Sequence, residues 1–204
     1  MVGCPQICNL PPGNCPSYGI SEDCLYLSIF SPTFPSQDKD GYPVMIWIHG
    51  GAFTQGLGNC ALYNGSTFAQ KDVISVVINY RLGALGFMAS PSMEGNYGIA
   101  DQRAAMRWVV DNIAGFGGNP QAITLAGQSA GAMSLSVHLV SSKSKGLFQR
   151  GKSLHFSFAV LCSKNFTFII RHNGKQSVGS SLPHSRLCNC QCRRSVCLFG
   201  LRCG

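Results

Sequence analysis

Acidic residues are scarce in this sequence and are absent from its last part. Among 204 residues only eight are Asp or Glu, and none of them follows Asp111. Residues 1–150 contain all eight acids together with eight Lys and Arg, whereas residues 151–204 contain the other eight Lys and Arg. The net charge of +8 therefore belongs to the last 54 residues and says nothing about the partners of the first 150. We expect no nucleic acid partner.

The sequence also shows no leader-peptide pattern in its opening residues and no long uninterrupted apolar run. Its opening, MVGCPQICNLPPG, has neither a basic start nor a continuous apolar stretch, which predicts no signal peptide in this chain. The stretch from Leu154 to Ile170 is rather apolar, but His155, Lys164 and Asn165 interrupt it, and it is shorter than a bilayer-crossing helix. We therefore predict no membrane span.

Cysteine, by contrast, is abundant, and four of the eleven cysteines crowd a short opening segment that contains Pro and Gly: Cys4, Cys8, Cys15 and Cys24. Such spacing is typical of a disulfide-bearing loop that forms in an oxidising compartment. A later run, from Cys188 to Cys192, has C-x-C-x-C spacing and lacks the paired C-x-x-C pattern of structural zinc sites. We expect no metal site and no cofactor.

Short apolar runs in the first 150 residues predict three buried strands, at residues 44–48, 73–78 and 122–126. Between the second and third runs, apolar residues recur at steps of three and four from Ala105 to Phe116, which predicts an amphipathic helix. Gly117, Gly118 and Pro120 then stop it. Strand, helix and strand in this order indicate an α/β fold with a mainly parallel sheet and flanking helices.

The third predicted strand runs directly into Gly127-Gln128-Ser129-Ala130-Gly131, and a helix-compatible segment follows. This G-x-S-x-G pattern is that of a nucleophile elbow, in which a serine on a strained strand-to-helix turn projects its hydroxyl into a site. Crowding at such a turn demands small neighbours, which Gly127 and Gly131 supply. The alternative interpretation is a glycine-rich strand-helix connection without chemistry.

A second glycine-rich segment, His49 to Phe53, follows the first predicted strand. Its backbone N–H groups and the N–H of Ala130 are candidates to face one oxyanion, because glycine lets a backbone approach a reacting carbonyl closely. An ordinary glycine turn is the alternative.

Several segments in the same order resemble the type B carboxylesterase and cholinesterase family, and the resemblance covers about Cys4 to Arg150. Ser21 to Leu27 resembles its SEDCLYLN segment, with Ser28 where Asn is usual. The remaining similar segments are the oxyanion loop at His49 to Phe53, Asn79 to Gly83, Gly98 to Trp108, Asn112 to Pro120, and the elbow at Gly127 to Gly131.

This resemblance implies a truncated α/β-hydrolase fold and the hydrolysis of small-molecule carboxylic esters through an acyl-enzyme. It makes Ser129 the nucleophile, with Gly51, Ala52 and Ala130 as the oxyanion-hole donors. Cys24 matches a family half-cystine with Cys4 as its best partner, although Cys8 and Cys15 remain rivals. The family's location implies secretion or the lumen of the endoplasmic reticulum, where the sequon at Asn64 is a candidate for glycosylation.

The rest of a catalytic triad is missing, because the fold places an acid and then a histidine after the serine and no acid follows Asp111. None of the later histidines, His155, His172 and His184, has the family's context, and His138 is interpreted as a packing or surface residue. We therefore predict that this chain is inactive. A non-catalytic adhesion-type binding module and a regulatory truncation are the alternative functions.

The composition break predicts two parts. Residues 1–150 form a partial carboxylesterase domain, and residues 151–204 form an unrelated basic, Cys-rich tail that is disordered or results from intron read-through. Without later family strands, the strand that carries the elbow is expected to have an unpaired edge, which favours aggregation.

Overall fold

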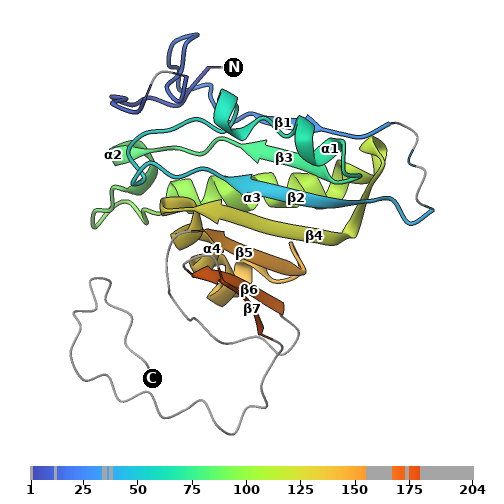
Figure 1. The fold of residues 1–204 in the computed structure, drawn as a ribbon. Coiled ribbons are helices and arrows are strands. Elements are labelled where there is room, and N and C mark those ends of the chain that lie inside the picture. The colour runs from blue at the N-terminus through green and yellow to red at the C-terminus, as the bar shows by residue number, and fades with distance from the viewer. Residues whose placement is uncertain are drawn as a thin grey trace, which may run out of the picture.

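The computed structural model of the chain describes residues 2–11, 13–33, 36, 39–154, 167–172 and 175–179. These residues form a twisted sheet of seven strands in the order β1-β3-β2-β4-β5-β6-β7 (Figure 1). The strands are β1 (Leu27–Phe30), β2 (Tyr42–Ile48), β3 (Ile74–Ile78), β4 (Gly118–Gln128), β5 (Arg150–Leu154), β6 (Thr167–His172) and β7 (Lys175–Gly179).

The centre of the sheet is parallel, as predicted. β2 pairs in parallel with β3 on one side and with β4 on the other, and β4, β5 and β6 continue the parallel series. Only the outer described strands reverse direction, since β1 is antiparallel to β3 and β7 is antiparallel to β6. The three strands expected from the sequence are β2, β3 and β4, so the prediction of a mainly parallel α/β sheet is confirmed.

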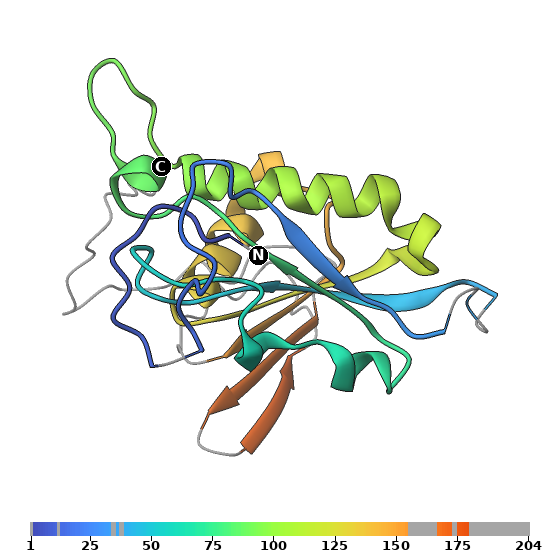
Figure 2. The same ribbon diagram turned by 90° about the horizontal axis from the view of Figure 1, so that it is seen from above.

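The sheet carries its long helices on one face. α3 (Tyr97–Asn112) connects β3 to β4, and α4 (Ala130–Val140) follows the elbow. The short elements η1 (Ala61–Tyr63) and α1 (Ser66–Ala69) lie on the face opposite α3 (Figure 2). The remaining short elements are α2 (Gly83–Phe87), η2 (Ile113–Phe116) and η3 (Ser142–Ser144).

The core forms where α3 meets the sheet. Met106, Val109 and Ile113 are fully buried against strand residues such as Ile46 and Leu125. This arrangement agrees with the predicted apolar period, except that Phe116 is 41% exposed. The regular helix also ends at Asn112, four residues before the predicted end, because residues 113–116 tighten into the 3-10 turn η2.

The burial of β2 differs in part from the prediction of a buried strand. Val44, Ile46 and Ile48 are buried, whereas Met45 and Trp47 between them are half-buried. The cause is the uneven covering of the sheet, because the face of β2 turned away from α3 is covered, in the described part of the chain, by short elements such as η1 and α1.

The edge of β4 is another difference, because the sheet continues past residue 150. β5 begins at Arg150 and pairs with β4 from Thr124 to Gln128, so the expected unpaired edge of β4 is occupied. The composition break at residue 150 is therefore not a break in the sheet. The positions His155, Asn165, His184 and Cys188 to Cys192 lie outside the described residues, and for His172 only the backbone is described.

Candidate nucleophile elbow and oxyanion loop

Two neighbouring strands bring the predicted elbow and the predicted oxyanion loop to the same edge of the sheet. β2 ends at Ile48, directly before the loop, and β4 ends at Gln128, directly before Ser129. Ile48 is paired with Gly127 in the parallel register. Because parallel strands end at one edge of a sheet, residues 49–53 and 129–131 extend from adjacent positions.

Ser129 adopts a backbone conformation that is unusual for a residue with a side chain. Its φ is 53° and its ψ is −119°, and it caps the N-terminus of α4. Positive φ in a non-glycine residue costs on the order of 1–3 kcal/mol and persists only where the surroundings impose it. The side chain of Ser129 is half-buried, so part of it remains open to solvent.

Glycines, which have no side chain, let the predicted oxyanion loop, the ends of β2 and β4, and the start of α4 pack closely together. A Cβ atom on Gly131 would overlap the carbonyl oxygen of Ile48, and one on Gly127 would lie 2.5 Å from the backbone of Gly131. A Cβ atom on Gly50 would lie 3.2 Å from the Cβ of Ser129. A methyl group added at Gly50 would therefore touch the side chain of Ser129. At Gly131 there is no room for a methyl group.

Among the described residues, the three amides expected to bind an oxyanion have no hydrogen-bond acceptor. In the described part of the chain, no hydrogen bond uses the N–H of Gly51, Ala52 or Ala130. Gly51 and Ala52 have φ values of 110° and 54°, and the Gly51 carbonyl accepts hydrogen bonds from the amides of Thr54 and Gln55 at 3.0 and 3.1 Å. The loop thus closes through its carbonyl and leaves its N–H groups available.

His49 and Tyr80 hold the start of this loop, and the sequence did not single out either side chain for this role. The Tyr80 hydroxyl donates a hydrogen bond of 2.9 Å to the His49 carbonyl, and the two rings stack with centroids 4.5 Å apart. The His49 ring also contacts the Gly50 carbonyl, 2.7 Å from Nδ1. Burial lowers the pKa of His49 to about 4, so its ring is neutral at neutral pH.

The disulfide-bearing opening segment contacts Gly56, three residues after the predicted oxyanion loop. Cys4 is bonded to Cys24 and Cys8 to Cys15. Between them, the side-chain amide of Gln6 donates to the Gly56 carbonyl at 2.8 Å and accepts from the Gly56 N–H at 2.7 Å. This reciprocal pair joins residues 50 positions apart, which explains why no local sequence pattern revealed it.

His138 is the first histidine after the elbow, and both of its ring nitrogens make contacts within the fold. It is 1% exposed; its Nδ1 lies 2.9 Å from the Ser144 hydroxyl and its Nε2 lies 2.9 Å from Oε1 of Gln102. Gln102 in turn donates to the Ser134 hydroxyl at 3.1 Å. Burial, with a smaller contribution from Arg103, lowers the pKa of His138 to about 4. These contacts leave neither ring nitrogen to accept a proton from Ser129.

Asn64 lies away from the elbow, between η1 and α1. Its side chain is exposed, and its Oδ1 accepts a hydrogen bond of 2.9 Å from the Ser66 amide. The described residues contain no group of three His, Cys, Asp or Glu arranged to hold a metal ion. None of their helices has the length and apolar character required to cross a bilayer.

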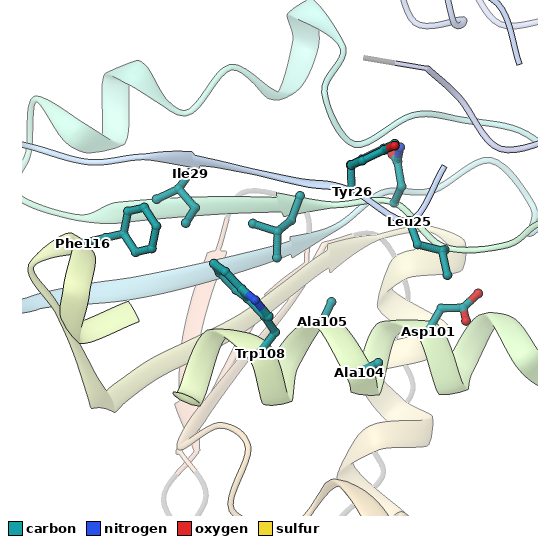
Figure 3. A pocket seen from close by; sticks show the side chains of 10 residues that line it. Leu25, Tyr26, Ile29, Asp101, Ala104, Ala105, Trp108 and Phe116 are labelled. Carbon is teal, nitrogen blue, oxygen red and sulfur yellow. The ribbon is translucent and has the colours of Figure 1, made fainter. Parts of the chain in front are cut away.

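A pocket of about 630 Å³ lies between β1 and α3, apart from the elbow. Figure 3 shows Trp108 and Ala105 projecting from α3 beneath Ile29 of β1, with Phe116 at one end of the pocket. None of the predicted site residues lines it. The lining of the pocket is mostly apolar.

Comparisons with known proteins agree on one relationship. The sequence profile described as "Carboxylesterase family" matches residues 1–159. The chain is 52% identical over 145 residues to the "cAMP-regulated D2 protein" of Dictyostelium discoideum, covering 71% of this chain and 27% of that protein. It is 51% identical over 136 residues to "Cocaine esterase" of Oryctolagus cuniculus, covering 65% of this chain and 25% of that protein.

A solved structure titled "thermophylic PNB esterase" superposes on this chain with a TM-score of 0.69 at 46% identity. The superposition covers 74% of this chain and 32% of that structure. The chain thus spans about a quarter of the length of the curated relatives it matches.

Proposed function

We propose that Ser129 is the nucleophile of a serine esterase site, starting from the fact that this chain belongs to the carboxylesterase family. The likeness to solved esterase structures also confirms the prediction of a partial α/β-hydrolase fold. The proposed chemistry is acyl transfer from a small-molecule carboxylic ester to the hydroxyl of Ser129.

One observation carries this proposal: Ser129 is half-buried at positive φ next to Gly50 of the predicted oxyanion loop, and the N–H groups of Gly51, Ala52 and Ala130 donate to no acceptor among the described residues. In acyl transfer, the carbonyl oxygen of the ester becomes negatively charged as the serine attacks. Amides of Gly51, Ala52 and Ala130 aimed at that oxygen stabilise the charge, and the N-terminus of α4 adds a favourable field. Structural glycine turns without chemistry have no need to leave such amides unpaired.

The same proposal holds that the chain alone turns over esters poorly. No acid follows Asp111, and both ring nitrogens of His138 are engaged. A serine without an oriented base loses about a millionfold in kcat relative to a complete triad. The oxyanion pocket alone retains a residual effect of about a thousandfold over water.

A fluorophosphonate probe tests the nucleophile directly, because it reports covalent capture and needs no turnover. We expect slow labelling of the folded parent chain at Ser129 and none in Ser129→Ala. The control Ser136→Ala removes another serine of α4 and should label like the parent. Absence of labelling above the Ser129→Ala background would refute the nucleophile and would favour a non-catalytic binding module.

Hydrolysis of a short-chain aryl ester tests the proposed inactivity separately. We expect equal rates for the parent chain and for Ser129→Ala. If only the parent turned over, the chain would be an active esterase in spite of the missing triad partners.

We also propose that the chain matures in the secretory pathway. Two disulfides link four of the five cysteines in the first 150 residues, and disulfides persist mainly in oxidising compartments. Mass spectrometry of alkylated protein isolated from its native source measures this: the four linked cysteines should resist alkylation until they are reduced.

A further inference from the structure

The sequon Asn64-Gly65-Ser66 occupies a position that a glycosylating enzyme can reach. Asn64 follows η1 and its side chain is exposed, as is that of Ser66. The Asn64 side chain lies at the rim of a hollow of about 110 Å³ on the face of the sheet opposite α3. No residue of the predicted oxyanion loop or elbow lines this hollow, so a modification here is independent of chemistry at Ser129.

Apolar side chains surround Asn64 on the same surface. Leu62 is 67% exposed and Phe68 is 46% exposed, and both line the hollow together with Tyr63 and the strand residues Met45 and Trp47. An isolated exposed leucine is ordinary on a protein surface. Two large apolar residues that flank a sequon and border an apolar hollow instead form a surface that gains from being covered.

We propose that Asn64 carries an N-linked glycan whose first N-acetylglucosamine packs over Leu62 and Phe68. One face of a pyranose ring presents C–H groups, so it can cover apolar side chains while the sugar hydroxyls stay in water. Burial of apolar surface stabilises such packing. The rest of the glycan keeps this face of the protein soluble.

The modification is a group transfer from a lipid diphosphate-linked oligosaccharide. A bond forms between Nδ2 of Asn64 and the anomeric carbon of the first sugar, and the bond from that carbon to the diphosphate oxygen breaks. The amide nitrogen loses one proton, and the lipid diphosphate is the leaving group. The donor resides in the compartment where the disulfides Cys4–Cys24 and Cys8–Cys15 form, so the inference rests on the proposed secretory maturation but not on esterase chemistry.

The first experiment asks whether Asn64 is modified. The full chain, directed into the secretory pathway of a eukaryotic host by a cleavable signal, is digested and the peptide containing Asn64 is analysed by mass spectrometry. We expect a glycan on this peptide in the parent and in Ser66→Thr, and its loss in Asn64→Gln and Ser66→Ala. An unmodified Asn64 in parent protein that entered the lumen would overturn the proposal.

Translation in the presence of microsomes keeps this test informative if a variant fails to fold or to be secreted. Glycan transfer then occurs on the nascent chain, and the same peptide analysis distinguishes Asn64 from any other site. A glycan in the parent and its loss in Ser66→Ala would support the modification, whereas an unmodified parent peptide would refute it.

The second experiment asks whether the first sugar covers the apolar surface. Trimming the purified glycoprotein to a single N-acetylglucosamine should leave the fluorescence of a hydrophobic dye unchanged, whereas complete removal of the glycan should raise it. In the double variant Leu62→Ser/Phe68→Ser, complete removal should no longer raise the signal. Equal dye binding before and after complete removal in the parent would overturn the packing.

Discussion

Glycines close to the ends of β2 and β4 stand where the neighbouring backbone leaves no space for a methyl group. At Gly131, an added Cβ would overlap the carbonyl oxygen of Ile48 at the end of the neighbouring strand. The conflict is with backbone, which cannot move aside as the tip of a flexible side chain can. The geometry around Ser129 therefore depends on residue identity at positions that carry no chemistry themselves.

Gly131→Ala should consequently destabilise the chain by about 3 kcal/mol or more, because overpacking against backbone forces a shift of the strand end or of α4. Gly115→Ala is the matched control, since nothing lies within 4 Å of its added Cβ and its φ is not positive. The control should stay within about 0.5 kcal/mol of the parent. Urea unfolding followed by circular dichroism measures both, and equal stabilities would contradict the proposed close approach.

Two buried neutral histidines make stability depend on acidity. His49 and His138 have folded-state pKa values of about 4, lowered from 6.5 chiefly by burial. Between pH 6.5 and 4 the unfolded chain binds protons that the folded chain does not, so stability is complete above about pH 6.5 and falls as the pH decreases. We expect a loss of about 2 kcal/mol per histidine at pH 5.

The variant His138→Gln should lose roughly half of this pH dependence, although its stability at pH 7.5 will be lower because contacts with Ser144 and Gln102 change. Urea unfolding of parent and variant at pH 7.5 and 5 provides the comparison. An unchanged difference between the two pH values would show that His138 does not titrate on unfolding.

At the scale of elements, the sequence predicted the parts whose patterns are local. β2, β3 and β4 came from short apolar runs, α3 from its apolar period, and the turn at Ser129 from a five-residue motif. β5 could not be recognised in this way, because Arg150 to Leu154 includes Lys152 and Ser153 and has no strand-like apolar pattern. Its strand conformation depends on pairing with β4, which is a tertiary contact.

The hydrogen bonds that support the candidate site could not be predicted from the sequence for the same reason, because they too are tertiary contacts. Gln6 meets Gly56, and Tyr80 meets His49, across separations of 50 and 31 residues. In neither case does the local sequence around one residue indicate its distant partner. The motifs thus predicted a candidate serine and candidate amides, whereas the contacts around them became visible only in the folded chain.

The reciprocal hydrogen bonds of Gln6 yield a prediction for the oxyanion loop. Gln6→Ala removes both bonds to Gly56 and should cost about 2 kcal/mol, since each net hydrogen bond contributes about 1 kcal/mol. Hydrogen exchange of the Gly56 amide should accelerate, and phosphonate labelling of Ser129 should slow. Gln121→Ala, at an exposed position of β4, serves as control and should change neither. Unchanged exchange at Gly56 in Gln6→Ala would contradict the proposed support.

On the scale of the whole molecule, the chain exposes apolar side chains that are not part of its buried core. α4 presents Met133, Val137 and Val140 at steps of four and three residues, with exposed fractions of 43%, 44% and 54%. They form a continuous stripe along one side of the helix. Apolar surface of this kind favours association of one copy with another.

Val137→Lys should therefore reduce the associated fraction of the chain at high concentration, because it places a charge in the middle of the stripe. Ser142→Lys adds the same charge at an exposed position just beyond α4 and should have a smaller effect. Sedimentation velocity measures the distribution of species. An equal reduction in both variants would attribute the effect to net charge and not to the stripe.

The pairing of Ile48 with Gly127 has a consequence for how the candidate site can fail. The two halves of the site, residues 49–53 and 129–131, follow paired residues of two adjacent strands. A change of strand register therefore shifts one half relative to the other in steps of one residue, about 3.3 Å. A register shift of one residue would also turn every side chain of β4 to the opposite face of the sheet. Mispairing would thus abolish the proposed anion pocket outright, and no intermediate geometry would let a displaced Ser129 keep part of its proposed reactivity.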